Sequence, residues 1–260
     1  EDPTFHVKLD EETGQTILWG MGELHLDVIA NRLVEEFGVA AKVGKPQVVY
    51  RETITKTVKV EGRFNREIGE KTHTGYVVLE LVPLLNGSGL EVVVELPEGS
   101  IPPEFIPVIE QSLRRTAMGG VLAGYPMVDV RITLCGGSYN VNDSTELGYE
   151  VAAAQGFTEG CRKAEPILLE PIMAVEVVVP EEFLGAVING LSARKGKIEG
   201  VAPKPRAKVV TAYVPLSKMF GYSTELRSLS QGRATFSMQF ARFDRATELP
   251  PGLSTSVTTA

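Results

Sequence analysis

Apolar and polar positions follow an order along the first 53 residues that predicts a small mixed module. Residues 4–9 and 15–19 alternate between apolar and polar side chains around an acidic turn, which predicts a β-hairpin. Apolar residues recur at helical spacing over 22–37, and residues 39–43 are expected to form a further strand. The resulting β-β-α-β order fits a ferredoxin-like βαββαβ sandwich that lacks its first strand and helix.

Residues 54–170 carry a second set of elements. The pattern predicts strands over 56–67, 76–83, 90–95 and 128–135, a helix over 103–118 and a long helix that ends near 163. Residues 143–146 (Asp-Ser-Thr-Glu) have the form of a capping box, so the long helix is expected to begin there. Glycine-rich turns are expected over 87–89 and 136–138. Strands combined with two helices indicate an α+β domain.

Residues 171–245 show a β-α-β-β-α-β order in full. The predicted strands cover 172–179, 197–202, 207–214 and 234–240, and the predicted helices begin at 180 and cover 217–230. This is the order of a complete ferredoxin-like sandwich. Residues 246–260 are rich in Pro, Ser and Thr and are expected to form a flexible tail. The sequence therefore predicts an α+β chain of three modules, 1–53, 54–170 and 171–245, followed by this tail.

Charge is distributed unevenly over these modules. The net charge is −7, yet residues 171–260 hold 11 Lys and Arg against 7 Asp and Glu. A basic surface of this kind indicates a polyanionic partner, although a solvated protein face explains the bias equally well. The only cysteines, Cys135 and Cys161, lack the spacing of a disulfide framework or a zinc site, so two reduced thiols are expected.

Several common reaction centres are missing from the sequence. It contains no GxxxxGK[ST] phosphate loop, no GxSxG elbow and no HExxH motif. His6, His25 and His73 lie in separate predicted elements, so neither a metal site nor a catalytic residue is expected. No apolar run reaches the roughly 18 residues that a membrane span needs. Because residues 1–4 resemble no signal peptide and no initiator Met is present, the chain is expected to begin inside a longer protein.

A series of short motifs runs along nearly the whole chain. In order, they are Gly20-Met21-Gly22-Glu23-Leu24-His25-Leu26, residues 43–54 (VGKPQVVYRETI), Gly137-Ser138-Tyr139, residues 169–173 (LEPIM), residues 193–196 (ARKG), residues 219–228 (MFGYSTELRS) and residues 231–233 (QGR). Together they resemble the elongation factor G family of translational GTPases. The resemblance implies part of domain III at 1–53, a ribosomal-protein-like α+β arm as domain IV at 54–170, and domain V at 171–245.

The resemblance implies two RNA-binding loops that lie side by side at the tip of the arm. In that family the tip enters the decoding site and holds the duplex of messenger and transfer RNA during translocation. By position, the loops correspond to residues 69–75 and 138–143. The candidate RNA-binding residues are Gly69, Glu70, Lys71, Thr72, His73, Gly75, Ser138, Tyr139, Asn140 and Asp143. Small residues allow close backbone approach, and polar side chains can bond 2′-hydroxyls and phosphates of an RNA helix.

The same resemblance implies contacts for the two outer modules. Domain V of the family docks on large-subunit rRNA beside a stalk-base protein. The candidates for phosphate contacts there are Arg194, Lys195, Lys197 and Arg233, with a solvated surface as the alternative for each. Glu23 and His25 are expected to face the GTPase domain, near the place where fusidic acid binds in this family.

Partners and cofactors follow from the resemblance as well. The implied partners are the ribosome, through 16S and 23S rRNA and ribosomal proteins, and the tRNA–mRNA duplex. Within 1–260 no enzyme activity, cofactor, metal or membrane contact is expected, and the chain is expected to be monomeric and cytoplasmic. The full-length parent would bind GTP and Mg²⁺ and hydrolyse GTP in its N-terminal domain.

The first tip loop departs from the family's usual Gly-Gly-Arg-Gly-Gln-Tyr-Gly run. Glu70, Lys71, Thr72 and His73 replace a glycine, the arginine, a glycine and the glutamine, and Asn140 stands where a His is usual in the second loop. Glu70 places a negative charge near an expected phosphate unless Lys71 offsets it. Two alternatives therefore stay open beside the standard factor. One is a diverged second copy that acts in ribosome recycling or protection, and the other is an enzyme that shares these modules and carries a cluster of titratable groups.

Overall fold

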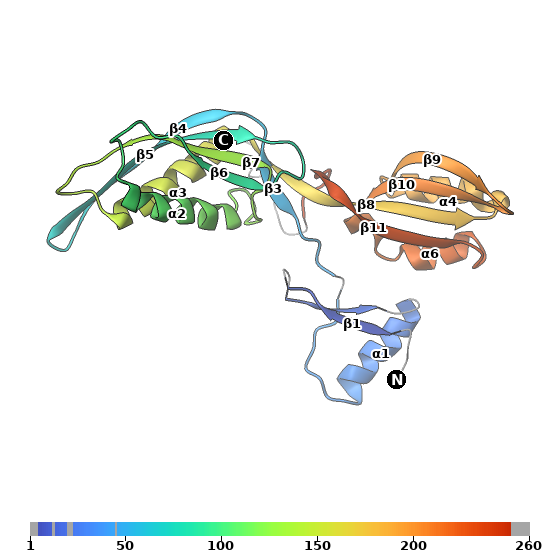
Figure 1. The fold of residues 1–260 in the computed structure, drawn as a ribbon. Helices are drawn as coiled ribbons and strands as arrows, with labels where there is room; N and C mark the ends of the chain where they lie inside the picture. The colour runs from blue at the N-terminus through green and yellow to red at the C-terminus, as the bar shows by residue number, and fades with distance from the viewer. Residues whose placement is uncertain (1–4, 12–13, 20–22, 45, 251–260) are drawn as a thin grey trace. The chain divides into compact units, whose positions relative to one another are not determined.

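The computed structural model describes residues 5–11, 14–19, 23–44 and 46–250 of the 260-residue chain. Its two compact units are Glu1–Val49 with Glu170–Arg242, and Tyr50–Leu169 with Phe243–Ala260. Both units combine helices with strands, so the predicted α+β class is confirmed (Figure 1).

The N-terminal segment is a hairpin followed by a helix. Its elements are β1 (His6–Leu9), β2 (Thr16–Trp19) and α1 (Glu23–Glu35). The two strands pair antiparallel, as predicted. The strand predicted over 39–43 does not form, because these residues are exposed and the Ala41 amide donates to the Val39 carbonyl at 2.8 Å. An extended segment needs a neighbouring strand for its backbone groups, so this prediction was wrong.

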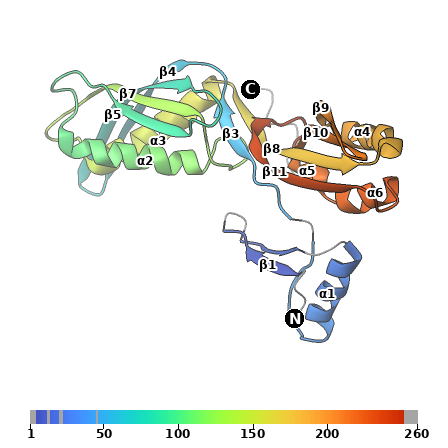
Figure 2. The same cartoon turned by 45° about the vertical axis from the view of Figure 1, so that its right-hand side comes forward.

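A four-stranded sheet and two long helices form the arm. Its elements are β4 (Val58–Ile68), β5 (Lys71–Pro83), β6 (Leu90–Val94), the 3₁₀ turn η1 (Pro103–Phe105), α2 (Ile106–Met118), β7 (Val130–Ser138) and α3 (Glu146–Lys163). The strand order is β4-β5-β7-β6, in which β6 and β7 are parallel and the other pairs antiparallel. Both helices cover the same face of the sheet (Figure 1, Figure 2). Alternate residues of β5, Val77, Leu79 and Leu81, are fully buried there in one core with Phe157 of α3.

Helix α3 begins later than the sequence pattern indicated. Its N-cap is Thr145, whose hydroxyl accepts a hydrogen bond from the Gly148 amide at 3.1 Å. The predicted capping box is therefore corrected, since Glu146 is already the first helical residue and Asp143 lies in the preceding turn. A threonine directly before a helix satisfies an unpaired amide as well as an aspartate does, so the residue types alone did not fix the start.

Strand β3 (Arg51–Ile54) anchors the beginning of the arm. It pairs antiparallel with the first residues of β8 (Pro166–Val179). The side chain of Glu52 is fully buried, and its carboxylate accepts four backbone hydrogen bonds of 2.6–3.1 Å from Val121, Leu122, Ala123 and Tyr125. These charge-assisted bonds satisfy the buried carboxylate without a cation. Nothing in the local sequence pattern predicted this role.

The C-terminal module is a complete ferredoxin-like sandwich. Besides β8, it contains η2 (Glu181–Phe183), α4 (Leu184–Ala193), β9 (Lys197–Lys204), β10 (Ala207–Pro215), α5 (Leu216–Met219), α6 (Tyr222–Leu229) and β11 (Thr235–Arg245). The strand order β11-β8-β10-β9, with β10 antiparallel to both neighbours, is that of a split βαβ fold. Its core joins Val177 of β8 to Leu191 of α4 and Tyr222 of α6. Of the predicted tail, residues 251–260 lie outside the described part of the chain.

Candidate nucleic-acid interface

The structure brings the two predicted tip segments together at one end of the arm sheet. The Thr74 amide donates to the Asp143 carbonyl at 2.8 Å, and the Thr145 amide donates to the Thr74 carbonyl at 3.3 Å. On the neighbouring strand, Tyr76 of β5 lies opposite Ser138 of β7. The hairpin that joins β4 and β5 projects beyond the ends of α2 and α3 (Figure 1). Backbone hydrogen bonds therefore hold residues far apart in the sequence side by side, as the sequence indicated.

The first segment is a strand hairpin with a very short turn. Ile68 pairs with Lys71, so only Gly69 and Glu70 form the turn, and Gly69 has a positive φ of 68°. Glycine adopts this conformation without a steric penalty, as hairpin turns require. The predicted loop over 69–75 is thus corrected to a two-residue turn, because cross-strand pairing continues as far as the turn itself.

A hydroxyl at the start of α3 fixes the side chain of His73. The His73 Nδ1 atom lies 3.0 Å from Thr145 Oγ1, which also accepts the Gly148 amide. The Thr145 hydroxyl can donate its own hydrogen to Nδ1, which leaves the His73 Nε2–H group as a donor to another molecule. His73 therefore lies on the side of the hairpin that faces α3.

Two glycines let β5 and α3 touch at this point. A Cβ atom on Gly75 would lie 2.2 Å from the carbonyl carbon and oxygen of Gly148, and one on Gly148 would lie 2.0 Å from the Thr74 oxygen. Real Cβ contacts of this length do not occur, so both positions require glycine. Gly75 was predicted to admit RNA closely; the structure shows that it admits the α3 backbone.

The second segment is shaped largely by its own side chains. Asn140 accepts a hydrogen bond from the Asn142 amide at 3.0 Å, and its NH₂ group donates to the Asp143 carboxylate at 3.1 Å. The Ser138 carbonyl accepts from the Tyr149 hydroxyl at 2.7 Å, and burial raises the pKa of Tyr149, which keeps it a donor. The predicted contacts Ser138, Asn140 and Asp143 therefore also hold the loop in shape.

The outward-facing residues of the tip are of another kind. Val141 is 76% exposed, Ile68 49% and Tyr139 41%, although Tyr139 also stacks at 5.9 Å on Phe105. Sequence analysis missed Ile68, Val141 and the cap Thr145. The alternation of β4, continued to the Gly69-Glu70 turn, was the signal that would have placed Ile68 at the tip.

The structure gives Arg194 of the C-terminal module an internal role. Its Nε donates to Glu225 at 2.9 Å, its guanidinium also bonds the carbonyls of Lys218 and Phe220, and it lies 5.2 Å from the Tyr222 ring centre. The side chain is only 19% exposed. A guanidinium used in this way connects α4 to α6, which accounts for Arg194 without a phosphate partner.

The other basic candidates of that module are more accessible. Lys197 is 78% exposed and 3.8 Å from Glu199, whereas Arg233 forms an ion pair with Glu182 and lies over the Phe183 ring. Lys195 is exposed and has a positive φ of 59° directly after α4. Exposed ion pairs of this kind are weak and exchange readily for other partners.

The remaining predicted interface lies in the N-terminal segment. His25 is half-buried in the first turns of α1, and the Gly20–Gly22 part of its motif lies outside the described residues. Glu23 is the first residue of that helix. The structure places both on α1 and gives no partner domain for them.

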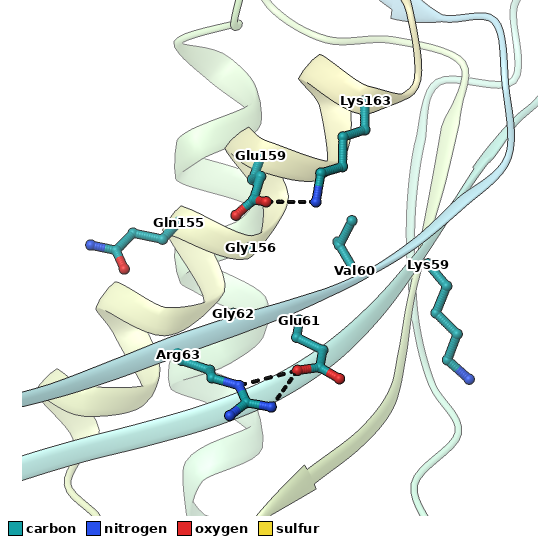
Figure 3. A pocket seen from close by; sticks show the side chains of 9 residues that line it. All are labelled: Lys59, Val60, Glu61, Gly62, Arg63, Gln155, Gly156, Glu159 and Lys163. Atoms are coloured by element: carbon teal, nitrogen blue, oxygen red, sulfur yellow. Dashed lines mark hydrogen bonds and ion pairs between the residues drawn. The ribbon is translucent and has the colours of Figure 1, made fainter.

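A shallow polar groove lies on the arm between β4 and α3 (Figure 3). It has a volume of about 540 Å³, and its walls carry the ion pairs Arg63–Glu61 and Lys163–Glu159 (2.6 Å). Arg63 also lowers the pKa of the Glu61 carboxyl through their hydrogen bond. Because most of its charges are already paired, the groove offers no reaction centre.

Two further features of the described residues bear on function. No group of three or more His, Cys, Asp or Glu side chains among them is placed to hold a metal ion. No helix in the same residues combines the length and apolar character needed to cross a membrane.

Comparison with known proteins assigns nearly the whole chain. Family models described as elongation factor G domain III, domain IV and C-terminus match residues 1–45, 46–165 and 167–251. A crystal structure of the protein ttk003000868 from Thermus thermophilus is 34% identical and superposes with a TM-score of 0.82 over 95% of this chain. The chain spans 37% of the length of that protein. In sequence and in fold, the chain belongs to the elongation factor G family and carries its domain III, domain IV and C-terminal regions.

Proposed function

We propose that this chain is the ribosome-binding part of a translation elongation factor G that promotes translocation of tRNA and mRNA. The observation that carries the proposal is the paired tip, in which Thr74 and Asp143 tie two distant segments together. The exposed groups there are a histidine Nε2–H, small residues and short polar side chains. Such groups bond RNA by shape and not by sequence, as a factor that serves every codon requires.

The remaining parts of the ribosome complex follow from the same proposal. The arm tip would contact 16S rRNA and the tRNA–mRNA duplex in the decoding site, and Lys195, Lys197 and Arg233 would contact 23S rRNA beside ribosomal proteins. GTP, Mg²⁺ and GTP hydrolysis belong to the N-terminal domain of a full-length parent, which acts as a monomer in the cytoplasm. Nucleotide turnover by purified 1–260 would contradict this division of labour.

A translocation assay tests the proposal. Tyr139 and Val141 are replaced with Ser in the full-length parent, and translocation and GTP hydrolysis on programmed ribosomes are followed by rapid kinetics. We expect slower translocation with unchanged GTP hydrolysis. The matched control is Leu85→Ser, because Leu85 is 85% exposed and follows the opposite end of β5. Equal translocation rates for both variants would refute a role for the tip.

A second candidate, ribosome recycling or protection by a diverged copy, is favoured by the charge of Glu70. This carboxylate is exposed at the hairpin turn and forms no ion pair among the described residues. A negative charge there opposes a phosphate. Glu70→Gly should accelerate translocation if the tip holds the tRNA–mRNA duplex. Unchanged translocation together with intact subunit splitting supports the recycling function instead.

A further inference from the structure

The β4–β5 hairpin separates its charges by face. Arg66 lies directly opposite His73, and Ile68 lies opposite Lys71. Residues paired in this way point to the same side of a sheet. Since His73 contacts Thr145 at the start of α3, the side chains of Arg66 and Lys71 also lie on the α3 side of the hairpin.

The other face of the hairpin carries no cation near the turn. Glu67 lies opposite Thr72 and Asn65 lies opposite Thr74, so one acid and three neutral polar residues form this face. Alternation along β4 continues it to Arg63, which is already paired with Glu61. The end of the hairpin is therefore basic on its α3 side and weakly acidic on the other.

The two cations of the α3 side are uncommitted. Arg66 and Lys71 are exposed, and neither forms an ion pair with any residue that the structure describes. The acids closest to this face are on the second segment and on α3. Of these, Asp143 accepts the Asn140 amide group, and Glu146 is an exposed residue of the first helical turn.

We propose that the α3 side of this hairpin is the face that contacts the RNA backbone, with Arg66 and Lys71 on phosphates and His73 Nε2–H as an additional donor. The inference rests on the function proposed above and specifies how the tip engages its partner. The cations are about 7 Å apart along the hairpin, so one nucleic-acid strand can contact both. Contacts to phosphates position a protein without reading sequence, and Glu67 disfavours RNA on the opposite face.

Salt dependence of ribosome binding tests this assignment. The chain 1–260 and the double variant Arg66→Gln/Lys71→Gln are bound to 70S ribosomes programmed with mRNA and tRNA at 50 and 200 mM KCl. Each phosphate contact steepens the logarithmic salt dependence by about 0.7–0.9, so two contacts account for a loss of roughly tenfold over this range. We expect the double variant to bind more weakly at low salt and to show a salt effect about tenfold smaller.

The matched control removes the same charge from the other face of the same strand. Lys59→Gln/Arg63→Gln should leave the salt dependence close to that of the unchanged chain, because both residues alternate with the α3 side of β4. An equal effect of the two double variants, or no effect of Arg66→Gln/Lys71→Gln, overturns the assignment. If the unchanged chain fails to bind programmed ribosomes at either salt concentration, the proposed function fails, and the assignment fails with it.

Discussion

The buried carboxylate of Glu52 sets the stability of the arm, and Glu52→Gln tests this. Glutamine keeps one acceptor oxygen, which can serve two of the four amides, but it turns an NH₂ group toward the other two. Each lost hydrogen bond to a charged group costs about 1.5–3 kcal/mol. Two lost bonds lower the free energy of unfolding of the arm by about 3–6 kcal/mol, a large part of the roughly 5–15 kcal/mol of a typical domain.

Hydrogen exchange measured by mass spectrometry gives this free energy for the arm alone, because the β5 and β7 peptides report only on their own sheet. The control is Glu165→Gln, which removes an exposed ion pair with Lys56 at the same end of the domain. That pair should contribute less than about 1 kcal/mol. If Glu52→Gln costs no more than about 1 kcal/mol, as an exposed pair does, the hydrogen-bonded carboxylate is not the anchor inferred here.

Three further predictions concern packing. Gly148→Ala should separate α3 from β5, because its Cβ would lie 2.0 Å from the Thr74 oxygen, and faster exchange of the 72–76 amides would show it. Cys161 should react with thiol reagents only on unfolding, since burial raises its pKa to about 12 and the thiolate forms only near that pH; rapid labelling at pH 8 would contradict this. Residues 5–44 should exchange faster than 172–240, because Ala30 is the one buried side chain described in that segment; equal protection would oppose it.

Element order was predictable from the sequence because periodicity reflects burial. The alternation of Val77, Leu79 and Leu81 and the helical spacing of Ile109 and Leu113 both correspond to fully buried positions. The strand expected at 39–43 has similar residue types but no partner strand. Periodicity describes one segment, whereas a strand forms only with a second segment, which explains why this prediction failed.

The candidate site was predictable in position but only partly in role. Motif positions placed both tip segments, yet they could not show that Asn140 bonds its own loop or that Gly75 packs against α3. Arg194 was chosen for its charge, although Glu225, located 31 residues away, uses that charge internally. Residue type gives the chemistry that a side chain can perform, and only the folded neighbours determine which partner it has.

The residues that hold the tip in place are distinct from most of those that it exposes. Backbone bonds of Thr74, the Gly75–Gly148 contact and the Thr145 cap fix the geometry, and none of them requires a particular side chain at Glu70 or Lys71. The turn needs a positive φ only at Gly69. The exposed chemistry of the hairpin can therefore change while its position does not. On this basis the departures at residues 70–72 alter how the tip binds RNA, and leave where the arm presents it unchanged.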